Sequence, residues 1–125
     1  MNREEKYLVI DDISGRIPHG VVFKTYWGNK TLKGIQYDYV NTLLYFGVCD
    51  STNKIIETYV SEVKPYLFPI SSMTKEQKNA IDLIASSSST VLSDVVDFYN
   101  KNHIDYRGLI PKGLALDATG LNIYF

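Results

Sequence analysis

Residues 64–77 read KPYLFPISSMTKEQ, and the sequence on their two sides follows different patterns. The residues before this segment are typical of strands, and those after it are typical of helices. Pro65 and Pro69 each fix φ at about −65° and lack a backbone N–H, so we expect neither a helix nor a central strand to run through the segment. We predict a stiff, extended crossing segment that leads into a helix through a capping box formed by Thr74 and Gln77. Its apolar side chains, which we expect to be buried, are Tyr66, Leu67, Phe68 and Ile70.

Upstream, four short runs rich in β-branched and aromatic residues predict strands. Short turns separate the runs, so we expect an antiparallel four-stranded meander. An alternative is that the same sheet curls into a small SH3-like barrel. A glycine within the second run, Gly34, predicts a bulge or a close backbone approach. The predicted strands are residues 21–27, 31–40, 43–49 and 54–60.

Helices are predicted on both sides of the strand region. Residues 4–17 have apolar side chains at helical spacing. The adjacent acids Asp11 and Asp12 point about 100° apart on a helix, so we expect a solvated polar face rather than a metal site. Residues 75–85 and 91–102 each carry an apolar stripe, and we expect both stripes to pack on one face of the sheet. The predicted fold class is α+β, with one domain spanning residues 1–125.

The tail at residues 104–116 is apolar but interrupted by two glycines and one proline. Burying three of its large side chains is worth several kcal/mol at about 25 cal/mol per Å². We therefore expect an irregular segment that is packed rather than mobile, docked on residues 64–77 so that Tyr66 or Leu67 touches it. Residues 121–125 predict a last edge strand.

The composition excludes several classes of protein. Hydrophobic residues make up 45% and charged residues 22%, which excludes wholesale disorder. The net charge is −1, with seven Lys and Arg against eight Asp and Glu in residues 1–62 and six against six in residues 63–125. That balance lacks the basic excess of a dedicated nucleic-acid binder. Cys49 cannot form an internal disulfide, and we expect a buried small hydrophobe in a reducing cytoplasm. The charged N-terminus predicts neither a signal peptide nor a membrane span.

Motifs that carry chemistry are missing from the sequence. No phosphate-binding glycine motif or nucleophile elbow occurs, and two histidines with one cysteine are too few for a zinc site without carboxylates. Asp94 and Asp97 share a helix face, but such carboxylates are usually solvated. His103 beside Asp105 resembles a base with its orienter, although a partner of the helix dipole is the simpler interpretation. We expect no catalytic residue, no metal and no cofactor, and a small hydrolase is the remote alternative.

Arg107 is the strongest candidate for a binding residue. It is the only charged side chain between Tyr106 and Lys112, in a loop bracketed by glycines, and arginine binds carboxylate or phosphate bidentately. The structural alternative is a buried pair with Asp105 or Asp117 that ties the tail down. The candidate binding residues are Lys64, Tyr66, Tyr106, Arg107 and Lys112.

Three motifs carry a resemblance to a known family. KPYL with its following proline and SSMT (residues 64–74), DYRGLIPKGLA (residues 105–115) and IPHGV (residues 17–21) resemble a family of small uncharacterised proteins of phages and prophages of gut Bacteroidales, including crAss-like phages. The resemblance spans nearly the whole chain in order and implies a phage context. The family has no assigned activity, so no chemistry is implied. Phe68 departs from the family's pattern, in which an arginine stands at this place, and that weakens the idea of phosphate binding.

Two functions follow as hypotheses. The first is a non-enzymatic protein-binding or adaptor module that acts on a phage or host protein in the cytoplasm of the bacterial cell. A homo-oligomer, in which the partner is a second copy of the chain, is a further option. The alternative is a nucleic-acid-associated accessory protein that binds through Tyr37, Tyr39 and Tyr45 with nearby lysines. No membrane partner is expected.

Overall fold

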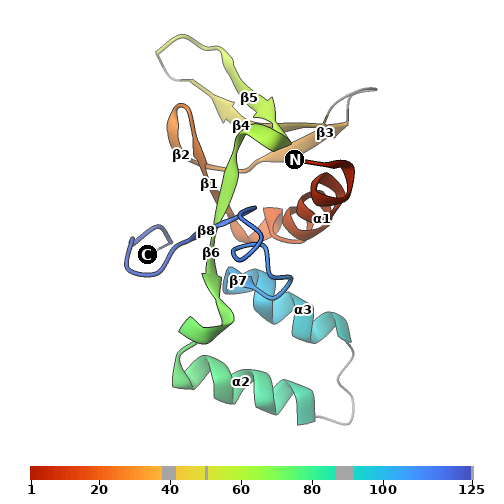
Figure 1. The fold of residues 1–125 in the computed structure, drawn as a ribbon. Coiled ribbons are helices and arrows are strands. Elements are labelled where there is room, and N and C mark those ends of the chain that lie inside the picture. The colour runs from red at the N-terminus through yellow and green to blue at the C-terminus, as the bar shows by residue number, and fades with distance from the viewer. Residues whose placement is uncertain (38–41, 50, 87–91, 125) are drawn as a thin grey trace.

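The structure, a computed structural model, describes residues 1–37, 42–49, 51–86 and 92–124. Within them the fold is α+β, as predicted, with helices on the outside and two sheets that do not close into a barrel (Figure 1). In chain order the helices and strands are α1 (Arg3–Ser14), β1 (Val22–Thr25), β2 (Gly28–Thr31), β3 (Gly34–Tyr37), β4 (Thr42–Val48), β5 (Ile55–Tyr59), β6 (Lys64–Pro69), α2 (Lys75–Ser86), α3 (Leu92–Lys101), β7 (Ile104–Asp105) and β8 (Leu116–Asp117), with 3-10 turns at Ile17–His19, Val60–Glu62 and Ile70–Ser72.

The strands are divided between two sheets, so the prediction of a single meander and its barrel alternative were wrong. One sheet has the order β2-β1-β6-β7 with β8 also paired to β6, and the other is β3-β4-β5. The chain changes sheets between two consecutive residues. The Leu32 N–H donates to the Val21 carbonyl (2.9 Å), extending the β1–β2 hairpin, and the Lys33 N–H donates to the Tyr45 carbonyl (2.8 Å) in the second sheet. The run predicted as one strand at residues 31–40 is therefore split, and its residues 38–40 lie outside the described part.

β6 is extended as predicted, but it is a central strand, which we had excluded because of its prolines. It has three partners in turn along its length: β1 at Lys64 and Pro65, β8 at Tyr66 and Leu67, and β7 at Phe68 and Pro69. The hydrogen bonds from β6 to the tail are made by backbone groups of residues other than proline, so the N–H groups that the prolines lack are not needed for them. The Phe68 N–H donates to the His103 carbonyl, and the Leu67 carbonyl accepts from the Ala118 N–H, both at 2.8 Å.

Burial along this segment follows the sheet. Tyr66 and Leu67 are buried and Phe68 is half-buried, whereas Ile70 is 46% exposed, contrary to our expectation. Ile70 is exposed because the chain leaves the sheet there in a 3-10 turn.

The core lies between α1, both sheets and the C-terminal tail. α1 begins with a capping box between Asn2 and Glu5 and buries one side against the sheets. The core residues are Val9, Ile10, Ile13, Val21, Phe23, Leu32, Leu44, Phe46, Ile56, Val60, Val63, Leu67, Leu109, Leu114 and Ala115. The bulge in this core is at Phe46 in β4, between Tyr45 and Gly47, and not at Gly34 as predicted. Gly47, at φ 113°, supplies the backbone conformation that the shift requires.

α2 and α3 lie at the far end of β6 from the β3–β4–β5 sheet (Figure 1). The predicted capping box starts α2: the Gln77 N–H donates to Thr74 Oγ1 (3.1 Å) and the Thr74 N–H to Gln77 Oε1 (2.9 Å). The two helices do not both pack on a sheet face, which corrects our prediction. α2 packs on α3, α3 packs on β7, and no side chain of α2 is buried. α2 makes its main contact with its neighbouring helix, and its Leu83 remains 73% exposed.

The tail docks on β6 as predicted, through the parallel pairs Tyr66–Leu116 and Leu67–Asp117. The described residues 121–124 form no strand, which corrects the predicted edge strand, because Gly120 (φ 76°) and Asn122 (φ 53°) turn the backbone out of extended geometry. Tyr124 instead anchors this end: its hydroxyl donates to the Tyr66 carbonyl and accepts from the Val22 N–H. Burial raises the pKa of Tyr124 to about 12.

No helix in the described part of the chain has the length and apolarity needed to cross a membrane.

Candidate functional site

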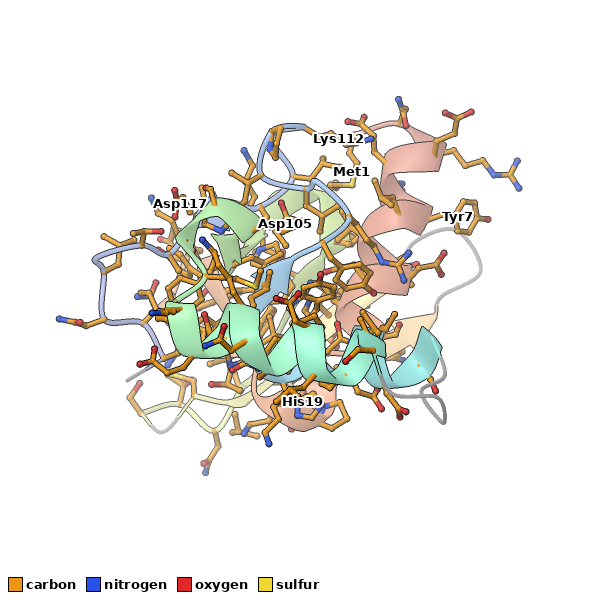
Figure 2. All side chains as sticks on the ribbon, turned by 90° about the horizontal axis from the view of Figure 1, so that it is seen from below. Met1, Tyr7, His19, Asp105, Lys112 and Asp117 are labelled. Atoms are coloured by element: carbon orange, nitrogen blue, oxygen red, sulfur yellow. The ribbon has the colours of Figure 1, made fainter. Side chains whose placement is uncertain are left out.

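The five predicted binding residues do not form one site. Tyr106 and Arg107 lie together on the tail. Lys64 is exposed at the start of β6, beside a hollow that Lys24 also lines, and Tyr66 is buried within the sheet. Lys112 is exposed on a loop at the edge of the molecule, whereas Asp105 lies in its interior (Figure 2).

Arg107 is held by a carboxylate, as predicted, but the carboxylate is Asp12 of α1 rather than Asp105 or Asp117. Arg107 Nε lies 3.5 Å from Asp12 Oδ1 and donates to the Tyr106 hydroxyl at 3.1 Å. The guanidinium also lies over the Tyr106 ring, 5.1 Å from its centre. The other two acids have local partners. Asp105 accepts the N–H groups of Leu109 and Ile110, and Asp117 accepts the N–H of Thr119.

Asp12 is fully buried, so our prediction that it lies on a solvated face was wrong; only Asp11 is exposed. The reason is an ion pair one helical turn away. Arg16, also fully buried, donates from Nε to Asp12 Oδ2 (2.8 Å) and from Nη2 to Asp12 Oδ1 (3.2 Å) and the Ile104 carbonyl (2.6 Å). Burial raises the pKa of Asp12, and the neighbouring arginines oppose that rise. The cluster therefore ties α1 to the tail, which is a structural role.

His103 does not face Asp105 as a base with its orienter. Its backbone is left-handed (φ 58°), and its ring stacks on Tyr124 with 3.6 Å between ring centres. The side chain is buried, and its Nδ1 has no partner among the described residues. Burial, helped by the charges of Arg16 and His19, lowers the pKa of His103 to about 4. The imidazole is thus neutral at physiological pH and a weak base.

Lowering the pH is expected to destabilise the protein through His103. Between pH 6.5 and about 4 the unfolded chain binds a proton at this histidine and the folded chain does not, so stability falls as the pH falls through this window. Since one pKa unit corresponds to about 1.4 kcal/mol, the loss is at most ~3.5 kcal/mol.

Urea unfolding of the wild type and of His103→Asn across this window measures the effect. Asparagine tolerates the left-handed backbone and does not titrate, so the variant is expected to show a shallower pH slope. Equal slopes, or a His103 pKa near 6.5 by NMR, would contradict the prediction.

The remaining acids and the cysteine are ordinary surface groups. Asp94 and Asp97 are both exposed on α3. In the described part of the chain, no three His, Cys, Asp or Glu side chains come together as a possible metal site. Cys49 is half-buried rather than buried, because it lies in the turn between β4 and β5. Hydrogen bonds from Ser51 and Thr52 lower the pKa of Cys49 to about 7.

The feature that the sequence analysis missed is the outward face of the β3–β4–β5 sheet. Along β4 and β5 the inward residues Leu44, Phe46 and Ile56 belong to the core. Apart from Glu57, the outward residues of β4 and β5 are also apolar or aromatic, although an antiparallel sheet with one free face normally alternates to polar side chains there. We call this the outer sheet face; its residues are Leu43, Tyr45, Val48, Ile55 and Tyr59.

These five side chains are adjacent by register. Leu43 lies opposite Tyr59, and Val48 lies opposite Ile55 at the other end of the hairpin. Val48 is 47%, Ile55 61% and Tyr59 43% exposed. On the neighbouring strand Tyr45 lies opposite Gly34, which has no side chain to cover that ring. A strand at residues 54–60 was predicted from the sequence, but the sequence did not indicate which of its faces would remain uncovered.

No protein-family model, curated protein or solved structure matches the chain.

The outer sheet face, with its exposed apolar side chains, is the best-defined candidate site. A second exposed aromatic pair, Tyr26 and Trp27, lies at the tip of the β1–β2 hairpin, with Tyr26 93% exposed.

Proposed function

We propose that this protein is a non-enzymatic protein-binding module that docks a partner protein on the outer sheet face. The observation that carries the proposal is the group of apolar side chains on the outer sheet face, of which Val48, Ile55 and Tyr59 are each more than 40% exposed. Apolar side chains scattered singly on a surface need no explanation, but a contiguous group marks an interaction site. Here the strand register pairs Leu43 with Tyr59 and Val48 with Ile55, and Tyr45 lies between these two apolar pairs opposite Glu57.

β5 offers the partner a backbone edge as well as side chains. It is the last strand in the order β3-β4-β5 among the described strands. An edge strand presents N–H and C=O groups to solvent, and a partner strand that pairs with them gains main-chain hydrogen bonds. Ile55 and Tyr59, at the two ends of β5, would then give the specificity through pockets in the partner.

The charge of this face indicates the chemistry of the partner. Glu57 lies opposite Tyr45 in the middle of the outer sheet face, and no lysine or arginine lies on the strand residues of that face. A partner with an apolar surface and one basic residue opposite Glu57 is complementary to it. A nucleic acid would place phosphates against the Glu57 carboxylate, so this charge pattern favours a protein.

The biological setting follows from the resemblance of residues 64–74 and 105–115 to phage proteins of gut Bacteroidales. We place the module among the accessory proteins of such a phage or prophage, acting on a phage or host protein in the bacterial cytoplasm. A second copy of the chain is the other partner to consider.

Photo-crosslinking in bacterial cells that carry the phage or prophage genes tests the proposal. A benzophenone amino acid replacing Tyr59 is expected to cross-link one discrete partner protein. The same amino acid replacing Leu83, which is more exposed but lies on α2, is the control and is expected to give no such product.

Ile55→Glu is expected to remove the cross-link from position 59, and Leu83→Glu is not. Both residues are exposed, so neither change should unfold the protein. Equal products from positions 59 and 83 would overturn the proposal. Cross-links to nucleic acid would replace it with the alternative function, and cross-links to a second copy alone would replace the partner with a homo-oligomer.

A further inference from the structure

A separate polar cavity lies at the other end of β6 from the outer sheet face. It has a volume of about 220 Å³ and lies where the end of β6, the start of α2, the end of α3 and the C-terminal segment meet. The lining residues are Phe68, Ser72, Thr74, Gln77, Lys101, Asn102, His103 and Tyr124. None of these described residues is acidic.

Several polar groups of this lining offer hydrogen-bond donors. Thr74 Oγ1 already accepts from the Gln77 N–H, so its own hydroxyl hydrogen remains to be donated. Gln77 Oε1 accepts from the Thr74 N–H, so the side-chain NH₂ group of Gln77 is the donor end. One of its two hydrogens is donated to Asn102 Oδ1, with 3.5 Å between the nitrogen and the oxygen. Lys101 is exposed and forms no ion pair with a described residue. An anion with several acceptor atoms is complementary to such a set.

The remaining wall is aromatic. Phe68 and Tyr124 contact each other at 5.9 Å between ring centres, and Tyr124 stacks on the buried ring of His103. Nδ1 of His103 is buried and has no hydrogen-bond partner among the described residues. Because this imidazole is neutral at physiological pH, it adds no second positive charge beside Lys101.

The volume limits the size of the occupant. Drug-sized ligands use cavities of about 300–1,000 Å³, whereas a cavity of about 150 Å³ accommodates one benzene ring. At about 220 Å³ there is room for one six-membered ring with a small charged group.

We propose that this cavity binds a small aromatic oxyanion, with the ring against Phe68 and Tyr124 and the carboxylate or phosphate group toward Lys101, Thr74 and Gln77. Asp97, one turn before Lys101 on α3, lines the neighbouring hollow together with it. Asp97→Asn removes a negative charge near Lys101 and is therefore expected to tighten anion binding.

Titrations of the full chain with benzoate, phenyl phosphate and benzamide, followed by NMR, test this proposal. Benzoate is expected to shift the His103 ring and Gln77 side-chain amide signals and to bind at least tenfold more tightly than the neutral benzamide. Phenyl phosphate distinguishes the two oxyanions: tighter binding than benzoate identifies a phosphate ligand, and weaker binding identifies a carboxylate.

Lys101→Gln is expected to weaken benzoate binding at least tenfold. Lys78→Gln is the matched control, because Lys78 is exposed on α2 and does not line the cavity, and it should leave binding unchanged. Both changes are at exposed positions, and melting curves confirm that each variant folds. Equal affinity for benzoate and benzamide, unaltered binding by Lys101→Gln, or no shift of these signals at millimolar benzoate would overturn the proposal.

Discussion

Deletion of residues 104–125 is expected to unfold the protein rather than to remove an appendage. The deletion takes away β7 and β8 and with them two of the three partners of β6. It also removes Ile104, Leu109 and Leu114, each at most 6% exposed. Burying a large aliphatic side chain is worth about 1.5–3 kcal/mol, so these three alone approach the 5–15 kcal/mol stability typical of a domain. Circular dichroism and thermal melting measure the outcome.

Two leucines of the tail give a matched pair of milder changes. Leu109→Ala removes a fully buried side chain and is expected to cost about 2–5 kcal/mol. Leu121→Ala changes a side chain that is 53% exposed and is expected to stay within about 0.5 kcal/mol of the wild type. A truncated protein with an unchanged melting temperature, or equal effects of the two alanines, would show that the tail does not support the fold.

Asp12→Ala is expected to destabilise the protein by about 3–5 kcal/mol, because it leaves the buried charge of Arg16 without its partner. The neighbouring Asp11 supplies the control. It lies on the same helix and carries the same charge, but it is exposed, so Asp11→Ala is expected to change the free energy of unfolding by less than about 0.5 kcal/mol. Urea unfolding at neutral pH measures both.

The double change of Asp12 and Arg16 to leucine separates pairing from packing. Replacing both charges removes the unpaired ion, so this variant is expected to be more stable than Asp12→Ala. If Asp12→Ala and Asp11→Ala had the same small effect, Asp12 could not be the buried anchor of Arg16 and Arg107.

The elements that could be predicted from sequence are those whose signals are local. The capping box of α2 needs only Thr74 and Gln77, and the helices and most strands follow from periodicity. The central place of β6 could not be predicted, because its partners Phe23, Ile104 and Leu116 are distant in sequence. The parallel pairing of β6 with the short strands β7 and β8 in an irregular tail leaves no periodic pattern in the sequence.

The candidate sites, too, could be predicted from sequence only where the signal is local. Arg107 was identified as tied to a carboxylate, but Asp12 lies 95 positions earlier and only the spacing from Asp12 to Arg16 hinted that the acid is paired. The outer sheet face depends on which side of the sheet α1 covers, and packing decides that rather than alternation. The polar cavity joins residues of four segments, none of which carries a motif of its own.

The three-partner arrangement of β6 has a consequence for the chain during its synthesis. β1 is made before β6, whereas Ile104 follows Pro69 by 35 residues. At about 5–20 residues per second that interval lasts roughly 2–7 s. Throughout it, the backbone groups of β6 that will later pair with the tail have no partner from the tail, and other strands attach to such groups. Pro69 denies such a strand one of the N–H groups it would need, so a residue that makes β6 unusual helps to protect the nascent chain from mispairing until its own tail is made.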